Sequence, residues 1–79
     1  ELTAYPVPNK GTFKLAFSKN LSNAAVTLVN AQGVVCFATT LTGTQSEATI
    51  NAEGLKTGVY FVRLTSDEGT VAPITVIIE

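Results

Sequence analysis

Apolar and polar residues alternate along several short stretches of this chain, and this period of two is typical of half-buried β-strands. In residues 12–17, Phe13, Leu15 and Phe17 fall on one face, because successive strand side chains point to opposite faces of a sheet. Strand patterns also appear in residues 24–30, 48–50, 59–66 and 70–78. No stretch has a convincing 3.6-residue period, so the pattern predicts strands rather than helices.

Turn-forming residues separate these strands at intervals of about 8–12 residues, as in all-β sandwiches and barrels. The expected loops and turns are residues 9–11, 18–23, 30–33, 42–46 and 67–69. The sequence therefore predicts an all-β fold, specifically an immunoglobulin-like antiparallel β-sandwich of about seven strands.

Two of the predicted strands have special features. Residues 34–41 are almost continuously apolar, which suits a strand covered on both faces. The last strand contains Pro73, which lacks a backbone donor, so we expect this strand at a sheet edge or bulged near its start.

Residues 54–64 have the layout of a tyrosine corner, with a leucine, a glycine-containing turn and a tyrosine that opens a strand. We expect Tyr60 to fill the edge of the core and its hydroxyl to bond the backbone near Leu55. Phe61 points to the opposite face. A neighbouring strand or loop is expected to cover Phe61, and a contact patch is the alternative.

Length and composition indicate one folded domain, residues 1–79, with residues 1–4 as a linker remnant. Apolar residues make up 46% and charged residues 14% of the chain, which argues against disorder. The formal net charge of -1 provides no basic field for nucleic acid or an anionic membrane. There is no apolar run long enough for a membrane-spanning helix. Because the chain begins with Glu1 and shows no signal peptide, we expect a piece of a longer protein.

Candidate chemistry is sparse. The sequence has no histidine and one cysteine, Cys36, which argues against a structural zinc site and removes the usual general base. Cys36 is expected to be a small buried hydrophobe, with a reactive thiol or an intermolecular disulfide as alternatives. Asp67 and Glu68 are adjacent in a predicted turn, where solvated charge is favoured over a calcium or other metal site.

No P-loop, G-x-S-x-G or G-x-G-x-x-G motif is present. We therefore expect no catalytic, cofactor-binding or metal-binding residues, and a function in binding, recognition or assembly. The aromatic residues Phe13, Phe17 and Tyr60 share faces with aliphatic residues, so we expect them in the core rather than on a carbohydrate platform.

Three pieces of the chain together resemble the C-terminal sorting domain of type IX secretion system cargo proteins of Gram-negative Bacteroidetes. They are the opening at residues 5–11, the Leu-x-x-Gly-x-Tyr corner at residues 55–60 and a hydrophobic strand that runs to Glu79. The turn at residues 30–33 matches the family's middle hairpin, with Asn30 in place of the usual Asp. The resemblance covers almost the whole chain in the family's order.

The resemblance implies a non-enzymatic label without a cofactor, which directs its cargo through the periplasm and across the outer membrane to the cell surface or the medium. The implied partners are the type IX translocon and a surface sortase that removes the domain, without direct membrane insertion. The residues carried over for recognition are Pro6, Pro8, Gly11, Gly33, Leu55, Gly58, Tyr60, Ile74, Thr75, Val76, Ile77, Ile78 and Glu79. The last strand lacks the family's common basic residues, which leaves strand shape and apolar side chains as the features to be read.

Other functions stay open at this point. An immunoglobulin-like or fibronectin-III-like spacer or adhesion module would share the sandwich and the tyrosine corner. A carbohydrate-binding module would need exposed aromatic residues, for which Phe61 is the candidate. An exposed sheet edge and a free Cys36 also lead us to expect that the isolated domain can form a homodimer.

Overall fold

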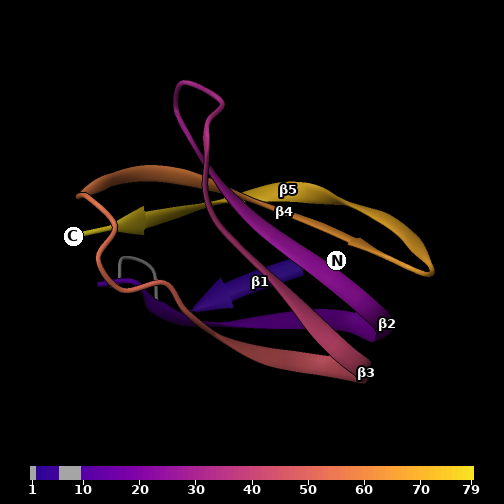
Figure 1. Ribbon diagram of the computed structural model, residues 1–79. Coiled ribbons are helices and arrows are strands. Elements are labelled where there is room, and N and C mark those ends of the chain that lie inside the picture. The colour runs from indigo at the N-terminus through magenta and orange to yellow at the C-terminus, as the bar shows by residue number, and fades with distance from the viewer. Residues whose placement is uncertain (1, 6–9) are drawn as a thin grey trace.

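The computed structural model describes residues 2–5 and 10–79, and within these residues every regular element is a strand (Figure 1). None of the described residues belongs to a helix long and apolar enough to cross a membrane. The all-β prediction is confirmed. The strands are β1 (Leu2–Tyr5), β2 (Thr12–Asn30), β3 (Val35–Asn51), β4 (Gly58–Ser66) and β5 (Gly69–Ile78).

All strand pairs are antiparallel, and they form the two layers of a sandwich (Figure 1). One layer contains β1, the first half of β2 and the second half of β3. The other contains the first half of β3, the second half of β2, and then β4 and β5. β1, β4 and β5 each lie within one layer, whereas β2 and β3 each contribute one half to both layers. Counting each half separately gives seven strand segments. The prediction of an immunoglobulin-like sandwich of about seven strands is confirmed.

The passage between the layers differs from the prediction. Residues 18–23 and 42–46, which were expected as a loop and a turn, continue β2 and β3 without interruption. Register shifts accompany the passage, and Asn23 takes a φ of 54° while Gly43 takes a φ of 73°. Glycine and asparagine tolerate this left-handed conformation, so the strands bend here instead of ending. Within the bend, Leu21 still pairs with Gln45 and Ser22 with Thr44 of β3.

The core lies between the two layers and follows the predicted alternation. Phe13 and Tyr60 are buried in it together with Phe17, as expected from their strand positions. Leu2 is also buried and belongs to β1, which pairs with β2, although residues 1–4 were expected as a linker remnant. The other buried residues of the cluster are Leu15, Leu21, Ala24, Val26, Leu28, Ala48, Ile50, Ala52, Val62, Leu64, Val76 and Ile78.

The first half of β3 lies at an edge of its layer, because among the described strands it pairs only with β2. Val35 is 55% exposed, so the prediction that residues 34–41 form a strand covered on both faces is wrong. Cys36 is exposed as well, which overturns its expected burial. A register shift leaves Cys36 without an opposite residue on β2, since Leu28 pairs with Phe37 and Val29 pairs with Val35.

The opposite edge of the same layer is β5, which among the described strands has a hydrogen-bonded neighbour only in β4. A register shift between Val62 and Leu64 leaves Ala72 and Pro73 outside the regular pairing. Pro73 therefore sits in an irregularity of an edge strand, which confirms both alternatives that its missing donor suggested.

Candidate recognition surface

The tyrosine corner has the predicted geometry. Tyr60 is 5% exposed, and its hydroxyl donates a hydrogen bond to the backbone carbonyl of Lys56 at 2.7 Å. Leu55 is partly buried against the core just before the turn. The corner thereby fixes the start of β4 and its angle to the preceding segment. Leu55 and Tyr60 therefore stabilise the fold: both side chains pack in or against the core, and the Tyr60 hydroxyl bonds the backbone.

Gly11 is confined by its neighbours. It has a φ of 112°, and a Cβ built on it would lie 2.8 Å from the carbonyl oxygen of Ala52. The amide of Ala52 donates to the Gly11 carbonyl at 2.7 Å, which ties the start of β2 to the segment leading into the tyrosine corner. Only glycine fits both the conformation and the close approach. The neighbouring motif residues Pro6 and Pro8 lie outside the described residues.

The middle hairpin is organised by Asn30. Its side-chain Oδ1 accepts hydrogen bonds from the amides of Gln32 at 2.9 Å and Val34 at 3.0 Å. Gly33 closes the turn with a φ of 85°, as expected for the glycine of a tight hairpin. An aspartate at this position would offer the same acceptor oxygen, so Asn30 can fill the place that the resemblance gives to Asp.

β5 connects directly to the tyrosine corner. Gly58 pairs with Ile78, and Tyr60 pairs with Val76. Side chains alternate between the two faces along β5: Val76 and Ile78 are buried, and Thr75 and Ile77 are exposed. Glu79 is exposed after the last strand residue. β5 thus combines a buried row that anchors it with an outer row that faces solvent.

An apolar patch lies on the outer face of this layer. Val59 pairs with Ile77, and their side chains are 45% and 43% exposed. Phe61 pairs with Val29 of β2 and is 38% exposed, and Val29 in turn pairs with Val35. The expectation that a strand or loop covers Phe61 is wrong, and Phe61 belongs to an exposed patch with Val35, Val59 and Ile77.

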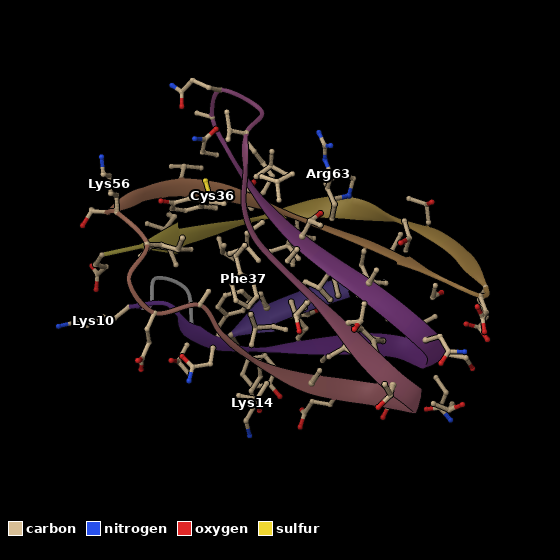
Figure 2. The ribbon with its side chains drawn as sticks, viewed as in Figure 1. Lys10, Lys14, Cys36, Phe37, Lys56 and Arg63 are labelled. Carbon is tan, nitrogen blue, oxygen red and sulfur yellow. The ribbon has the colours of Figure 1, made fainter. Side chains whose placement is uncertain are left out.

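The structure brings most of the predicted recognition residues together. Leu55, Gly58, Tyr60 and residues 74–79 meet where β4 begins and β5 ends. The middle hairpin adjoins them, because Asn30, Ala31 and Gln32 share a hollow of about 240 Å³ with residues 56–60. Gly11 is connected to this region through Ala52. Figure 2 shows Lys56 at the same end of the sandwich, projecting from the turn.

Sequence reasoning missed the role of the acidic turn between β4 and β5. Asp67 and Glu68 are exposed, as predicted, but both are bonded to the bend of β2. The hydrogen bond from the Ser22 amide lowers the pKa of Glu68 below its ordinary value, against a smaller opposing effect of desolvation. No pattern within the sequence links residues so far apart in the chain.

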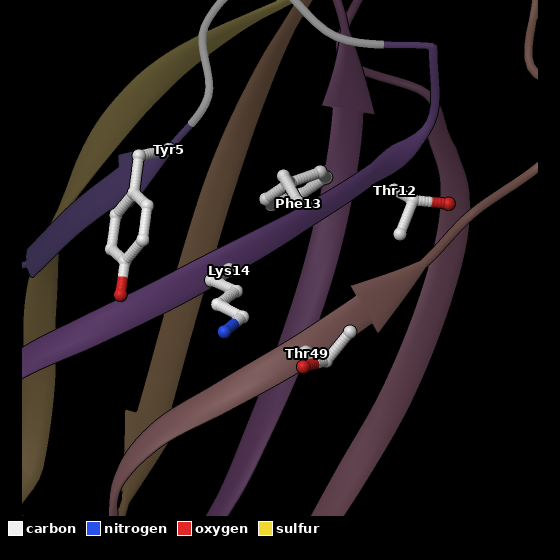
Figure 3. Close-up of a pocket in the computed structure, with 5 residues that line it drawn as sticks. All are labelled: Tyr5, Thr12, Phe13, Lys14 and Thr49. Atoms are coloured by element: carbon white, nitrogen blue, oxygen red, sulfur yellow. The ribbon is translucent and has the colours of Figure 1, made fainter.

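A second hollow, of about 260 Å³, lies on the other layer and is lined by Tyr5, Thr12, Phe13, Lys14 and Thr49 (Figure 3). The Tyr5 hydroxyl donates to the carboxylate of Glu47, and this bond raises the tyrosine pKa. The described residues contain no group of three or more His, Cys, Asp or Glu side chains that could hold a metal ion.

Comparison with known proteins identifies both fold and family. The family model for the secretion system C-terminal sorting domain matches residues 3–79. Among solved structures, the crystal structure of CopC from Methylosinus trichosporium OB3b is similar, with a TM-score of 0.60 and 14% identity over 99% of this chain and 91% of that chain. At this identity the likeness shows the fold alone. No curated protein matches the chain.

The family match decides between a sorting domain and a generic spacer or carbohydrate module. It spans essentially the whole described chain, including the tyrosine corner and the edge strand β5. The cargo of such a domain is a secreted or cell-surface protein. The chain belongs to the secretion system C-terminal sorting domains, and it is a C-terminal sorting signal of the type IX secretion system.

Proposed function

We propose that the type IX translocon reads this domain at the open edge of β5, by adding a strand of its own to the sheet. In strand addition, backbone hydrogen bonds provide affinity and alternate side chains provide specificity. β5 offers both, because it is an edge strand and its outer row carries Thr75 and Ile77. The open β5 edge is the observation that carries the proposal.

The remaining motif residues act by building the fold under this proposal. Gly11 and Gly33 both take a positive φ, which would strain a residue with a side chain. At Gly11 a side chain would also clash with the backbone of Ala52. Tyr60 and Leu55 set the corner from which β4 runs beside β5. Recognition through these residues is indirect, since they hold the edge strand in place. Direct contact is assigned to β5 and its exposed residues.

We further propose that the domain is non-enzymatic and passes through the periplasm before a surface sortase removes it. The sortase is expected to cut before β1, because Leu2 is buried and residues 2–5 pair with β2. A protease requires an accessible extended backbone, which a paired core strand does not offer. Sequencing the N-terminus of the released domain tests the placement, and a cut within β1 or further along the chain, such as within residues 13–17, would exclude it.

The export proposal is tested with a reporter that carries residues 1–79 at its C-terminus, expressed with a signal peptide in a type IX host. Ile77→Lys places a charge on the outer row of the β5 edge, a position where charge opposes strand addition. Val59→Lys is the matched control, because Val59 is the equally exposed partner of Ile77 on the neighbouring strand β4. Surface-exposed reporter is measured by protease accessibility, and circular dichroism checks that each domain folds.

We expect Ile77→Lys to retain the reporter in the periplasm and Val59→Lys to display it. Equal display by both folded variants would exclude recognition at the β5 edge. Deleting residues 74–79 is a poorer test, because it removes the buried side chains of Val76 and Ile78. Each contributes about 1.5–3 kcal/mol to folding, so the deletion confuses recognition with stability.

The sequence-based expectation of a homodimer of the isolated domain also remains a proposal. Two edges of the same layer, β3 and β5, are open to a second copy among the described strands. Exposed Cys36 could also link two copies through a disulfide.

A further inference from the structure

The hollow at the end of the sandwich is formed where the middle hairpin meets the tyrosine corner. It has a volume of about 240 Å³ and is lined by residues 30–32 of the hairpin and residues 56–60 of the corner. None of these residues has a carboxylate, and among them only Lys56 carries a charge. Turns that a rigid scaffold brings together in this way are frequent binding sites.

The polar groups that line this hollow are used unequally by the fold. The Oδ1 of Asn30 accepts two hydrogen bonds from hairpin amides, and the Lys56 carbonyl accepts one from the Tyr60 hydroxyl. By contrast, no hydrogen bond or ion pair within the described part of the chain engages the amides of Ala31 and Thr57 or the ammonium group of Lys56. The lining therefore offers a cation and neutral donors to a ligand that accepts hydrogen bonds.

We propose that this hollow binds a carboxylate group of the translocon component that pairs with β5. Gly58 lines the hollow and pairs with Ile78 at the end of β5. A partner strand on the open edge of β5 lies two strand spacings from β4, which is about 10 Å and within reach of a residue that flanks the partner strand. The identity of the partner rests on the proposed function, whereas the chemistry of the hollow does not.

The charge of the hollow favours a carboxylate over a phosphate. An ionised carboxylate has a single negative charge and only accepts hydrogen bonds, which suits one lysine beside neutral donors. A phosphate monoester carries a charge of about −1.5 to −2 and is typically held by arginine clusters. No arginine lines the hollow. A protein carboxylate therefore fits this site better than the phosphate of a lipid or polysaccharide.

Glu79 provides an internal test of the electrostatics. It follows Ile78, the partner of Gly58, and so continues β5 toward the turn that carries Lys56. Its negative charge opposes the binding of a carboxylate in the hollow. Removing that charge should strengthen the binding of an acidic ligand, whereas the binding of a neutral ligand should not respond.

Binding is tested by NMR titration of isotope-labelled residues 1–79 with two peptides that differ in one group, acetyl-Val-Asp-Val-amide and acetyl-Val-Asn-Val-amide. The acidic peptide should give saturable shifts at the amides of Ala31, Gln32 and Thr57, and the neutral peptide should give none at the same concentration. Acetyl-Val-Val-Val with a free terminal carboxylate distinguishes a terminal carboxylate from a side-chain carboxylate as the preferred source. Inorganic phosphate is the probe for a phosphate-bearing ligand.

Three variants check the assignment to Lys56. Lys56→Gln should weaken binding of the acidic peptide by about threefold, and Glu79→Gln should strengthen it. Lys10→Gln is the matched control and should bind as wild type does, because Lys10 lies at the same end of the sandwich (Figure 2) and does not line the hollow. The proposal would be overturned by an absence of saturable shifts, by stronger shifts with phosphate than with the acidic peptide, or by equal losses in Lys56→Gln and Lys10→Gln.

The fused reporter separates this inference from recognition at the β5 edge. Lys56→Glu should lower surface display, whereas Lys10→Glu and Val59→Lys should keep it, the latter because it adds a cation beside the hollow. Circular dichroism checks that each variant folds. If Ile77→Lys blocks display and Lys56→Glu does not, the hollow is not used in export although the β5 edge is. If neither variant blocks display, recognition at the β5 edge fails as well.

Discussion

The carboxylate of Glu68 accepts a hydrogen bond from the backbone amide of Ser22 at 2.8 Å, across 46 residues of sequence. Next to it, the Asp67 amide donates to the Ser22 carbonyl at 3.0 Å, and the Asn23 side-chain amide donates to the Asp67 carboxylate at 2.8 Å. These contacts fasten the β4–β5 turn to the bend where β2 passes between the layers. The carboxylates of Asp67 and Glu68, each bonded to the bend of β2, thus hold the start of β5 in place.

This contact predicts a specific acid sensitivity. The pKa of Glu68 is lower in the folded domain than its ordinary value of 4.5, so the unfolded chain binds the proton more readily. Stability from Glu68 is fully present above that ordinary value and is lost as pH falls through the lower folded value. Urea unfolding at a series of acidic pH values should therefore show a steeper loss for wild type than for Glu68→Gln.

Glu53→Gln controls for the loss of a negative charge, because Glu53 is exposed and lies outside the contact with Ser22. If Glu68→Gln and Glu53→Gln gave identical pH profiles, the Glu68–Ser22 contact would be irrelevant to acid stability.

Removing the Tyr60 hydroxyl should weaken the domain without disturbing the core. Tyr60→Phe keeps the ring and leaves the Lys56 carbonyl without the bond at 2.7 Å. A loss of about 0.5–1.5 kcal/mol in the free energy of unfolding is expected. Tyr5→Phe is the matched control, since the Tyr5 hydroxyl bonds the exposed carboxylate of Glu47 and should cost less. Urea titration measures both, and a larger loss for Tyr5→Phe would refute the assignment.

Gly11 and Gly33 should differ in their tolerance of alanine. Both have positive φ, so each substitution is strained, but only at Gly11 does the new Cβ meet backbone, 2.8 Å from the Ala52 oxygen. We expect Gly11→Ala to destabilise by about 3 kcal/mol and Gly33→Ala by about 1 kcal/mol. Thermal unfolding of the two variants compares them directly, and equal shifts would contradict the close approach at Ala52.

Cys36 should react as an accessible thiol in the folded domain, because it is exposed at the bulge of β3. One equivalent of thiol per chain is expected to react with Ellman's reagent without denaturant. Cys36→Ser should change the free energy of unfolding by less than about 0.5 kcal/mol, as for a surface substitution. Reaction that required urea would restore the sequence-based prediction of a buried cysteine.

Local patterns in the sequence predicted the elements that depend on local residues. The tyrosine corner follows from Leu55, Gly58 and Tyr60 within a few positions, and the hairpin follows from Asn30 and Gly33. The edge position of the last strand followed from Pro73, since a missing donor has a local meaning wherever the strand lies.

Features that depend on pairing across the chain could not be predicted in this way. An apolar run such as the one around Cys36 looks the same in a central strand and in an edge strand, because burial is decided by neighbours. The polar residues around Asn23 resemble a loop, yet Ser22 in the bend pairs with Thr44 of β3. Glu68 shows the same limit, since its partner Ser22 becomes a neighbour only in the folded sandwich.

The central claim is that the translocon recognises the β5 edge. It can be tested by covering that edge without changing any residue of the domain. A short turn and an added strand after Glu79, designed to pair with β5, would occupy the edge on which the proposal depends. A tail of the same composition with prolines, which cannot pair, is the control. The measurement is the fraction of a fused reporter that reaches the cell surface in a type IX host. A surface fraction that falls for the paired strand but not for the proline tail is predicted, and equal display of both would contradict the account.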